Sequence, residues 1–185
     1  MTIHSRGELV ELIDQGRTFE YLHFYSHKQN ADGNISESCC SQWYPASFVV
    51  DQITYLTAEH FMMAGKARLF NDADTLEGIL KCKTSREAKA LGREVRNFER
   101  DLWRERCTEI VVAGNLAKFE QHPPLANWLK LTNPMILVEA AADDRVWGIG
   151  MADSDADAQD PRRWNGENLL GFALMQVRER LVQGK

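Results

Sequence analysis

The sequence predicts an α+β fold, a mostly helical single domain with a small sheet. Three observations lead to this expectation. Short runs of aromatic and β-branched residues, typical of strands, gather before residue 57. From residue 57 onward, apolar residues recur mainly at helical spacing. The length of 185 residues, 44% of them hydrophobic, suits one domain with its own core.

The first part of the chain combines one short helix with three strands. Ser5 is a suitable N-cap for an amphipathic helix that stops at Gly16. Strands are expected at residues 21–25, 47–51 and 53–55, with a polar loop at 26–38, and we expect the three strands to form the small sheet. Residues 1–20 are therefore a predicted helical extension in front of a domain that spans residues 21–185.

Helices dominate the rest of the chain. They are expected at residues 57–70, 85–98, 101–121, 124–131 and 169–182. Thr57 and Ser85 are the predicted N-caps of the first two, and Gly114 costs the longest helix about 1 kcal/mol relative to Ala. A buried strand at 135–139 and an acidic loop at 151–163 complete the order of elements.

Charge and hydropathy exclude several classes of protein. The net charge of −5 disfavours a non-specific nucleic-acid or membrane binder, because such proteins usually carry a basic stripe. No apolar run approaches the roughly 18–20 residues of a membrane span. The N-terminus lacks the charged start and apolar block of a secretory signal. We therefore expect a cytoplasmic protein without a membrane partner.

The cysteines and the acidic loop do not predict a metal site. The four cysteines, Cys39, Cys40, Cys82 and Cys107, contain no CxxC pair and have no His at zinc-ligand spacing, so reduced thiols are expected. Asp153, Asp155 and Asp157 match the start of a calcium loop, but Ala158 and Trp164 replace its Gly and Glu. We expect no metal and no cofactor.

The helix that follows Thr57 carries the first candidate site. Glu59 and Lys66 lie seven residues apart, about two turns, and so share one face, while His60 is rotated by about 100°. Gly65 would let another backbone or a ligand approach closely. The plainer interpretation is a solvated Glu/Lys face on an amphipathic helix.

The second candidate site follows the buried strand near residue 139. Glu139 leaves the end of this strand, and Asp144 precedes a Trp-Gly-x-Gly turn. Trp147 could stack on a flat heterocycle, and Gly148 could permit a tight turn near a phosphate or ribose. The plainer interpretation is a strand exit anchored by a tryptophan.

A third candidate lies at the start of the last helix. Asn168 is a plausible N-cap that would leave free N–H groups near an anion. Asn caps many helices, so this observation carries little weight alone. Phosphate-binding glycine loops, the nucleophile elbow of α/β-hydrolases and the zincin motif do not occur in the sequence.

The order of these motifs resembles the NADAR family, and within it the YbiA-like N-glycosidases. The matching segments are Phe24-Tyr25-Ser26, Cys40 to Pro45, Thr57-x-Glu-His-Phe-x-x-x-x-Lys66, Leu137-Val-Glu139, Asp144-x-x-Trp-Gly-x-Gly150 and Gly166-x-Asn-x-Leu-Gly171. Gly92-Arg93 and Lys118-Phe119 also lie where the family has similar residues. The resemblance covers residues 22–181, nearly the whole chain.

Some positions depart from the family pattern. Gln42 stands where the family has Asn, and Tyr55-Leu56 where it has Trp-Pro. Met63 and Gly65 occupy positions where Gln is often found, and the loop after Gly150 is longer and more acidic. These changes fall near the expected pocket, so they bear on the substrate more than on the chemistry.

The resemblance implies an enzyme that hydrolyses the bond between a ribose C1′ and a nitrogen. In the YbiA type the substrates are phosphorylated ribosylamino-pyrimidine intermediates of riboflavin biosynthesis. Other family members remove ADP-ribose from guanine, so a nucleic acid would be a partner only when ADP-ribosylated. A non-catalytic module that binds ADP-ribose or another nucleotide is the third alternative. The expected partner is a small phosphorylated, nucleotide-like substrate, and the oligomeric state stays open.

The residues suit this chemistry. Positive charge develops on the sugar as the nitrogen leaves, so a carboxylate beside C1′ stabilises the transition state or handles protons. Alternatively, Lys66 attacks C1′ of the opened ribose and forms an imine. The catalytic candidates are Glu59, Lys66, Glu139 and Asp144, and the candidates for substrate binding are Ser41, Trp43, His60, Arg93, Trp147, Gly148 and Asn168.

Overall fold

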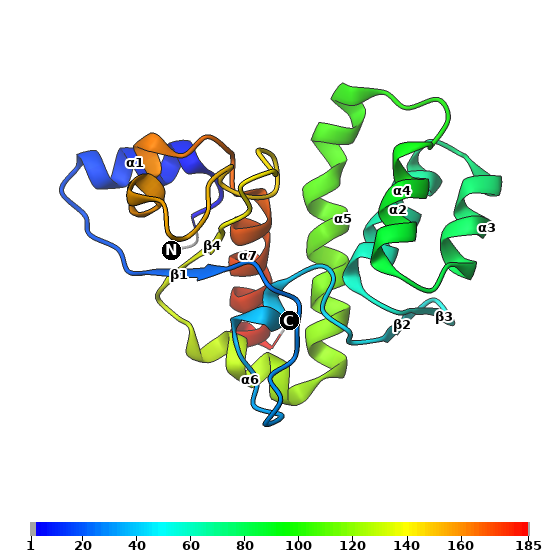
Figure 1. The fold of residues 1–185 in the computed structure, drawn as a ribbon, viewed down its shortest axis with the longest axis horizontal. Helices are drawn as coiled ribbons and strands as arrows, with labels where there is room; N and C mark the ends of the chain where they lie inside the picture. Colours follow the sequence, from blue (N-terminus) through cyan, green and yellow to red (C-terminus); the bar gives the residue numbers. More distant parts are fainter. Residues whose placement is uncertain (1–2, 185) are drawn as a thin grey trace. The chain divides into compact units, whose positions relative to one another are not determined.

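The computed structural model describes residues 3–184 and divides the chain into two compact units. One contains the residues up to Ser41 together with those from Pro124 onward, and the other contains Gln42–Pro123. Helices make up most of the secondary structure in both (Figure 1). The predicted class, α+β and mostly helical, is confirmed. None of the helices within residues 3–184 is long and apolar enough to cross a bilayer.

The first unit is built around a short parallel sheet. β1 (Tyr21–Phe24) pairs with β4 (Ile136–Glu139), and α7 (Leu169–Gln183) packs along β4. Its other elements are α1 (Arg6–Asp14), η1 (Glu37–Cys40), α6 (Pro123–Leu131), η2 (Ala156–Gln159) and η3 (Pro161–Arg163). The first three residues of β4 are buried, so this strand is the centre of the unit's core.

The second unit is a cluster of four helices beside a hairpin. The hairpin strands are β2 (Phe48–Val50) and β3 (Ile53–Tyr55), and the helices are α2 (Ala58–Leu69), α3 (Ala73–Lys81), α4 (Ser85–Arg93) and α5 (Arg100–Gln121). α2 packs against each of the other three helices. It is therefore the central element of this unit.

The expected single sheet is wrong, because the strands form two separate pairs. β2 and β3 are joined by Asp51 and Gln52, both at positive φ, as in a two-residue hairpin turn. β1 instead pairs with β4, more than 100 residues later. A parallel pair needs a long crossover, so sequence proximity pointed to the wrong partners for β1.

Glycines allow the helices of the second unit to pack closely. A Cβ at Gly65 would lie 2.6 Å from Ile110 Cγ2, and one at Gly114 would lie 2.5 Å from Phe61 Cδ1. These contacts join α2 to α5 from both sides. Of the two expected neighbours of Gly65, another chain segment or a ligand, the structure shows the first, because α5 lies against this glycine. The helix-weakening Gly114 has the same packing role.

The start of α4 lies one residue earlier than predicted. Thr84, not Ser85, is the N-cap, and it forms a capping box with Glu87. The helix ends at Arg93, five residues before the expected end. The sequence pattern Thr-x-x-Glu at residues 84–87 could have located this start.

Asp72 is the N-cap of α3. This helix was not predicted from the sequence. The carboxylate of Asp72 accepts hydrogen bonds from Thr75 N and Oγ1 and from Arg96 N, Nε and Nη2. The hydrogen bonds from Arg96, followed by those from Thr75, hold the pKa of Asp72 well below its usual range. The carboxylate thus stabilises the fold in its charged form.

We expect Asp72→Asn to lower the stability of the fold at neutral pH and to flatten its dependence on acid. Because the folded pKa is depressed, the carboxylate contributes stability above the unfolded pKa of about 3.9, and this contribution is lost as pH falls through the folded pKa. Urea unfolding between pH 2 and 7 measures the effect. If the variant had the same urea midpoint as the wild type at neutral pH and lost stability in acid in the same way, this role would be contradicted.

Candidate active site

The first turn of α2 holds a buried carboxylate. Thr57 caps the helix, and Glu59 donates its backbone N–H to the carbonyl of Gln42 at 2.9 Å. The residue Glu59 is only 5% exposed. A buried carboxylate is costly unless it is hydrogen-bonded or paired. The plainer interpretation, a solvated Glu/Lys face, is therefore wrong at this end of the helix.

Lys66 lies in an aromatic and partly buried environment. Its Nζ donates a 2.7 Å hydrogen bond to the carbonyl of Gly92 and lies 4.2 Å from the centre of the Phe98 ring and 5.6 Å from that of Trp103. Burial lowers the pKa of the amine. The ammonium is thus not directed into bulk solvent, and its surroundings favour a neutral amine more than water does.

The C-terminal turn of α4 brings Arg93 to the same region as Lys66. Arg93 follows Gly92, whose carbonyl holds the Lys66 amine, and its side chain is exposed. A Cβ at Gly92 would lie 2.1 Å from Sδ of Met63 on α2. The family departure at Met63 therefore serves helix packing. Arg93 remains available as the predicted contact for an anion.

His60 is part of the interior that joins α2 to α4. Its Nδ1 lies 2.8 Å from Thr57 Oγ1, which is 3.0 Å from Ser85 Oγ, and the residue is 3% exposed. Burial, the largest influence, lowers the pKa of the imidazole. In this arrangement His60 supports the helix start, and its contact with a substrate stays a prediction.

The segment before the hairpin places Trp43 beside Lys89 in the middle of α4. Lys89 Nζ lies 5.9 Å from the centre of the Trp43 ring, which is half-buried. The adjacent Gln42 is buried; its Oε1 accepts a 2.7 Å hydrogen bond from Asn115 Nδ2, and its Nε2 lies 3.5 Å from Met62 Sδ. The longer Gln at this family position thus connects the segment to α2 and α5.

In the first unit, Asn168 fixes the end of β4 where Glu139 lies. Its Oδ1 accepts from Glu139 N at 2.9 Å, and its Nδ2 donates to the carbonyl of Leu137 at 2.9 Å. The residue is fully buried and has a left-handed backbone with φ of 57°. Asn168 therefore positions Glu139, whereas direct contact between Asn168 and a substrate stays a prediction.

The loop after β4 is folded around Asp144. Its Oδ1 accepts hydrogen bonds from Val146 N at 2.9 Å and Trp147 N at 2.8 Å. A Cβ at Gly148 would lie 2.9 Å from the carbonyl oxygen of Glu139. In this structure Gly148 allows two backbone segments to approach each other. Trp147 is half-buried beside them.

The first N–H groups of α7 are not free for an anion, which corrects the expectation for this helix start. Leu169 N donates to the carbonyl of Val146 at 3.2 Å, and Leu170 N donates to that of Trp147 at 3.1 Å. Asn168 N likewise donates to the carbonyl of Gly148. Asn168 occupies the N-cap position, but its side chain makes no capping hydrogen bond.

Lys118, which the sequence indicated only as a family position, is one of the most buried residues of the described chain. It is 0% exposed, and its Nζ lies 4.7 Å from the centre of the Phe119 ring. Lys118 lies three residues after the buried Asn115 and seven after the buried Val111, on one face of α5. The sequence signal that could have identified Lys118 as buried is that two polar residues, Asn115 and Lys118, occur on the apolar face of α5.

Each unit therefore gathers its own set of predicted residues. In the second unit, α2, α4 and the segment before the hairpin carry Trp43, Glu59, His60, Lys66 and Arg93. In the first unit, the carboxyl end of β4 and the loop after it carry Glu139, Asp144, Trp147, Gly148 and Asn168, while Ser41 is buried just after η1. The catalytic and binding roles of these residues stay predictions.

Comparison with known proteins identifies the family. The NADAR domain model matches residues 23–182. N-glycosidase R617 of Acanthamoeba polyphaga mimivirus is 37% identical over an alignment of 167 residues, which covers 88% of this chain and 96% of that protein. N-glycosidase YbiA of Escherichia coli K12 is 33% identical over 133 residues, 72% of this chain and 74% of YbiA.

A solved structure agrees with this relationship. The NMR structure of the E. coli protein YbiA matches with a TM-score of 0.72 and 27% identity, covering 91% of this chain and 88% of that one. The chain belongs to the NADAR domain family. Its relatives named N-glycosidase bear out the expectation that it is a hydrolase acting on N-glycosyl bonds.

Proposed function

We propose that the N-glycosidase activity of this chain cleaves the C1′–N bond of phosphorylated ribosylamino-pyrimidine intermediates of riboflavin biosynthesis. The observation that carries the proposal is the pair on α2, in which the buried Glu59 and the half-buried Lys66 share one helix face. Their burial supports the proposal, because reacting groups in enzymes commonly lie in such shielded positions.

In the first route, a carboxylate stabilises the sugar cation. As the C1′–N bond breaks, its electron pair leaves with the pyrimidine amine and positive charge develops at C1′. Glu59 is the first candidate for stabilising that charge and for deprotonating the attacking water. Glu139 and Asp144 are the other carboxylates proposed for this work. The exposed Arg93 is the proposed contact for the phosphate.

In the second route, Lys66 acts as a nucleophile. Its neutral amine attacks C1′ of the ring-opened substrate, the C1′–N bond to the pyrimidine breaks, and the pyrimidine amine leaves with a proton. Water then adds to the lysine imine and releases ribose 5-phosphate, which restores the amine. Glu59 would carry the protons. The pKa of Lys66, lowered by burial, supports this route.

One parallel assay tests the substrate. The protein is incubated with the ribosylamino-pyrimidine phosphate and, separately, with ADP-ribosylated DNA, and the release of ribose 5-phosphate or ADP-ribose is followed. We expect ribose 5-phosphate from the first. Release of ADP-ribose alone would identify the ADP-ribosyl glycohydrolase. Binding of either compound without release would identify the non-catalytic nucleotide-binding module.

A further inference from the structure

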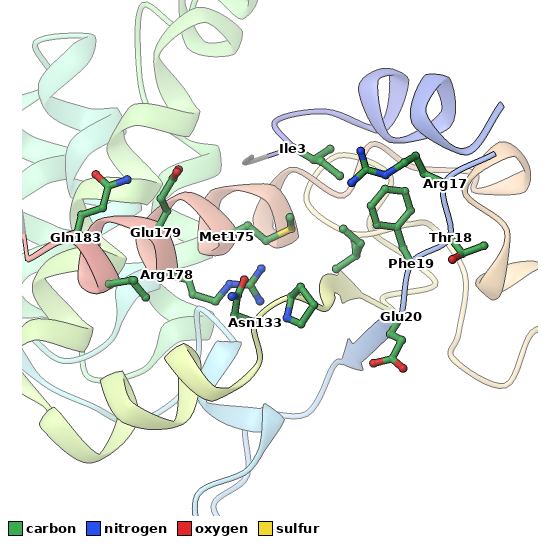
Figure 2. A pocket seen from close by; sticks show the side chains of 13 residues that line it. Ile3, Arg17, Thr18, Phe19, Glu20, Asn133, Met175, Arg178, Glu179 and Gln183 are labelled. Atoms are coloured by element: carbon green, nitrogen blue, oxygen red, sulfur yellow. The ribbon is translucent and has the colours of Figure 1, made fainter. Parts of the chain in front are cut away.

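A cavity of about 790 Å³ lies in the first unit (Figure 2). The strand bounds put it at the opposite end of the parallel sheet from Glu139. It lies beside the start of both strands, since Glu20 precedes β1 and Ile136 begins β4. Ile136 and Glu139 are three residues apart in a strand, about 10 Å. None of the predicted catalytic or binding residues lines this cavity. Its volume is within the usual range of small-molecule pockets.

Arg178 contributes to this cavity a buried guanidinium group that has no carboxylate partner among the described residues. The residue is only 5% exposed, and its Nη1 donates to Thr132 Oγ1 and to the carbonyl of Met135, both at 2.9 Å. These acceptors are neutral, and within residues 3–184 Arg178 has no carboxylate in an ion pair. Burial lowers the pKa of this guanidinium. A buried cation without a counter-ion is costly.

The hydrogen bonds of Arg178 leave one edge of its guanidinium group, formed by Nε and Nη2, available to a ligand. Nη1 is occupied by its two acceptors, whereas Nε and Nη2 have no hydrogen-bond partner among the residues that the structure describes. Neither nitrogen is among the fully buried unpaired atoms of that part of the chain. The Nε–Nη2 edge matches the two oxygens of a carboxylate or phosphate.

The other walls of the cavity suit the remainder of such a ligand. Figure 2 shows Arg178 and Met175 coming from α7, and Arg17 and Phe19 from the segment that leads into β1. Arg17 is exposed and adds a second guanidinium to the lining. Phe19, Met175 and the buried Ile136 provide apolar surface. Glu20 and Glu179 also line the cavity and balance the charges of Arg17 and Arg178. The specificity for an anion therefore rests on the Nε–Nη2 edge of Arg178 beside an apolar wall, which suits an amphipathic anion.

We propose that this cavity is a second ligand site, which binds a small organic carboxylate or phosphate ester with a flat apolar body. Arg178 holds the anionic group through its Nε–Nη2 edge, Arg17 adds charge, and the apolar body lies against Phe19 and Met175. The site is separate from the predicted catalytic residues. Its occupation is therefore measured independently of turnover.

Methyl NMR of the whole protein tests the proposal. Benzoate and phenyl phosphate are titrated while the Met175 methyl signal is followed, with neutral benzamide as the matched probe. We expect saturable shifts from at least one anion, with a dissociation constant of about 1 mM or below, and none from benzamide. No saturable shift, or equal binding of benzamide, would overturn the site.

Three variants assign the binding to the named side chains. Arg178→Gln should weaken binding at least about tenfold, and Arg17→Ala several-fold, the scale of a charge-assisted hydrogen bond. Arg17 is exposed, so its variant tests the site even if Arg178→Gln unfolds the protein. Arg180→Ala, which changes an exposed arginine of the same helix outside the cavity lining, should leave binding unchanged. Binding that survives Arg17→Ala unchanged would contradict the proposed role of the cavity.

Discussion

Glu59→Gln and Lys66→Ala are each expected to lower turnover of the ribosylamino-pyrimidine phosphate at least about 100-fold, the scale of acid–base groups. Gln has the shape of Glu59 but cannot hold negative charge or accept a proton. Ala removes the amine that lies 2.7 Å from the carbonyl of Gly92. Initial rates of ribose 5-phosphate release, taken at saturating substrate, measure both effects.

The controls must separate chemistry from packing, because Lys66 also binds the last turn of α4. Circular dichroism and thermal unfolding show whether each variant is folded. Lys66→Arg keeps a cation that can reach the Gly92 carbonyl but cannot form an imine. Near wild-type rates in folded Glu59→Gln and Lys66→Ala would eliminate the α2 pair as the reacting groups.

The pH profile distinguishes the two routes at Lys66. Burial places the pKa of this amine below its ordinary value of 10.5. If the neutral amine attacks C1′, the rate rises as pH increases through that lowered pKa. If the carboxylate route operates instead, deprotonation of Lys66 does not raise the rate. A profile that is identical in wild type and Lys66→Arg would show that Lys66 is not the titrating group.

Gly171→Ala is expected to destabilise the protein by about 3 kcal/mol or more, the upper range for overpacking. Gly171 lies in the first turn of α7, and a Cβ there would lie 2.0 Å from the carbonyl oxygen of Leu137. It would also lie 2.5 Å from Nδ2 of Asn168, whose side chain holds β4. The obstacle is backbone, so no side-chain rotation relieves it.

Thermal unfolding measures this effect. For a chain of this size the expected loss corresponds to roughly 6–12 °C in Tm. Gly7→Ala is the matched control, because Gly7 lies within α1 and a Cβ there finds only Ser5 Oγ, at 3.9 Å. That change should be neutral or slightly stabilising. Equal Tm values for the two variants would contradict the packing described for α7.

Local signals in the sequence predicted most elements, and long-range pairing accounts for the main error. The caps Ser5 and Thr57 located two helices, and both hairpin strands were placed within one residue at each end. α3 was missed although Asp72 is a good N-cap. The partner of β1 was not predictable from local pattern, because parallel pairing joins residues more than 100 positions apart.

For the candidate site too, the sequence predicted local features but not burial or the neighbouring segments. Spacing placed Glu59 and Lys66 on one face of α2, but it did not reveal that both are shielded. The motif glycines indicated that something approaches closely. At Gly65 this is Ile110, and at Gly148 it is the backbone of Glu139. A glycine in a sequence cannot distinguish a ligand from a neighbouring segment, since both require the same missing Cβ.

The most direct test of the account is the identity of the products formed by the wild-type protein. The ribosylamino-pyrimidine phosphate is incubated with the enzyme and followed by ³¹P NMR and chromatography. Cleavage of the C1′–N bond predicts ribose 5-phosphate and the free aminopyrimidine in equal amounts, with the phosphate ester intact. Unchanged substrate, or inorganic phosphate in place of ribose 5-phosphate, would contradict it.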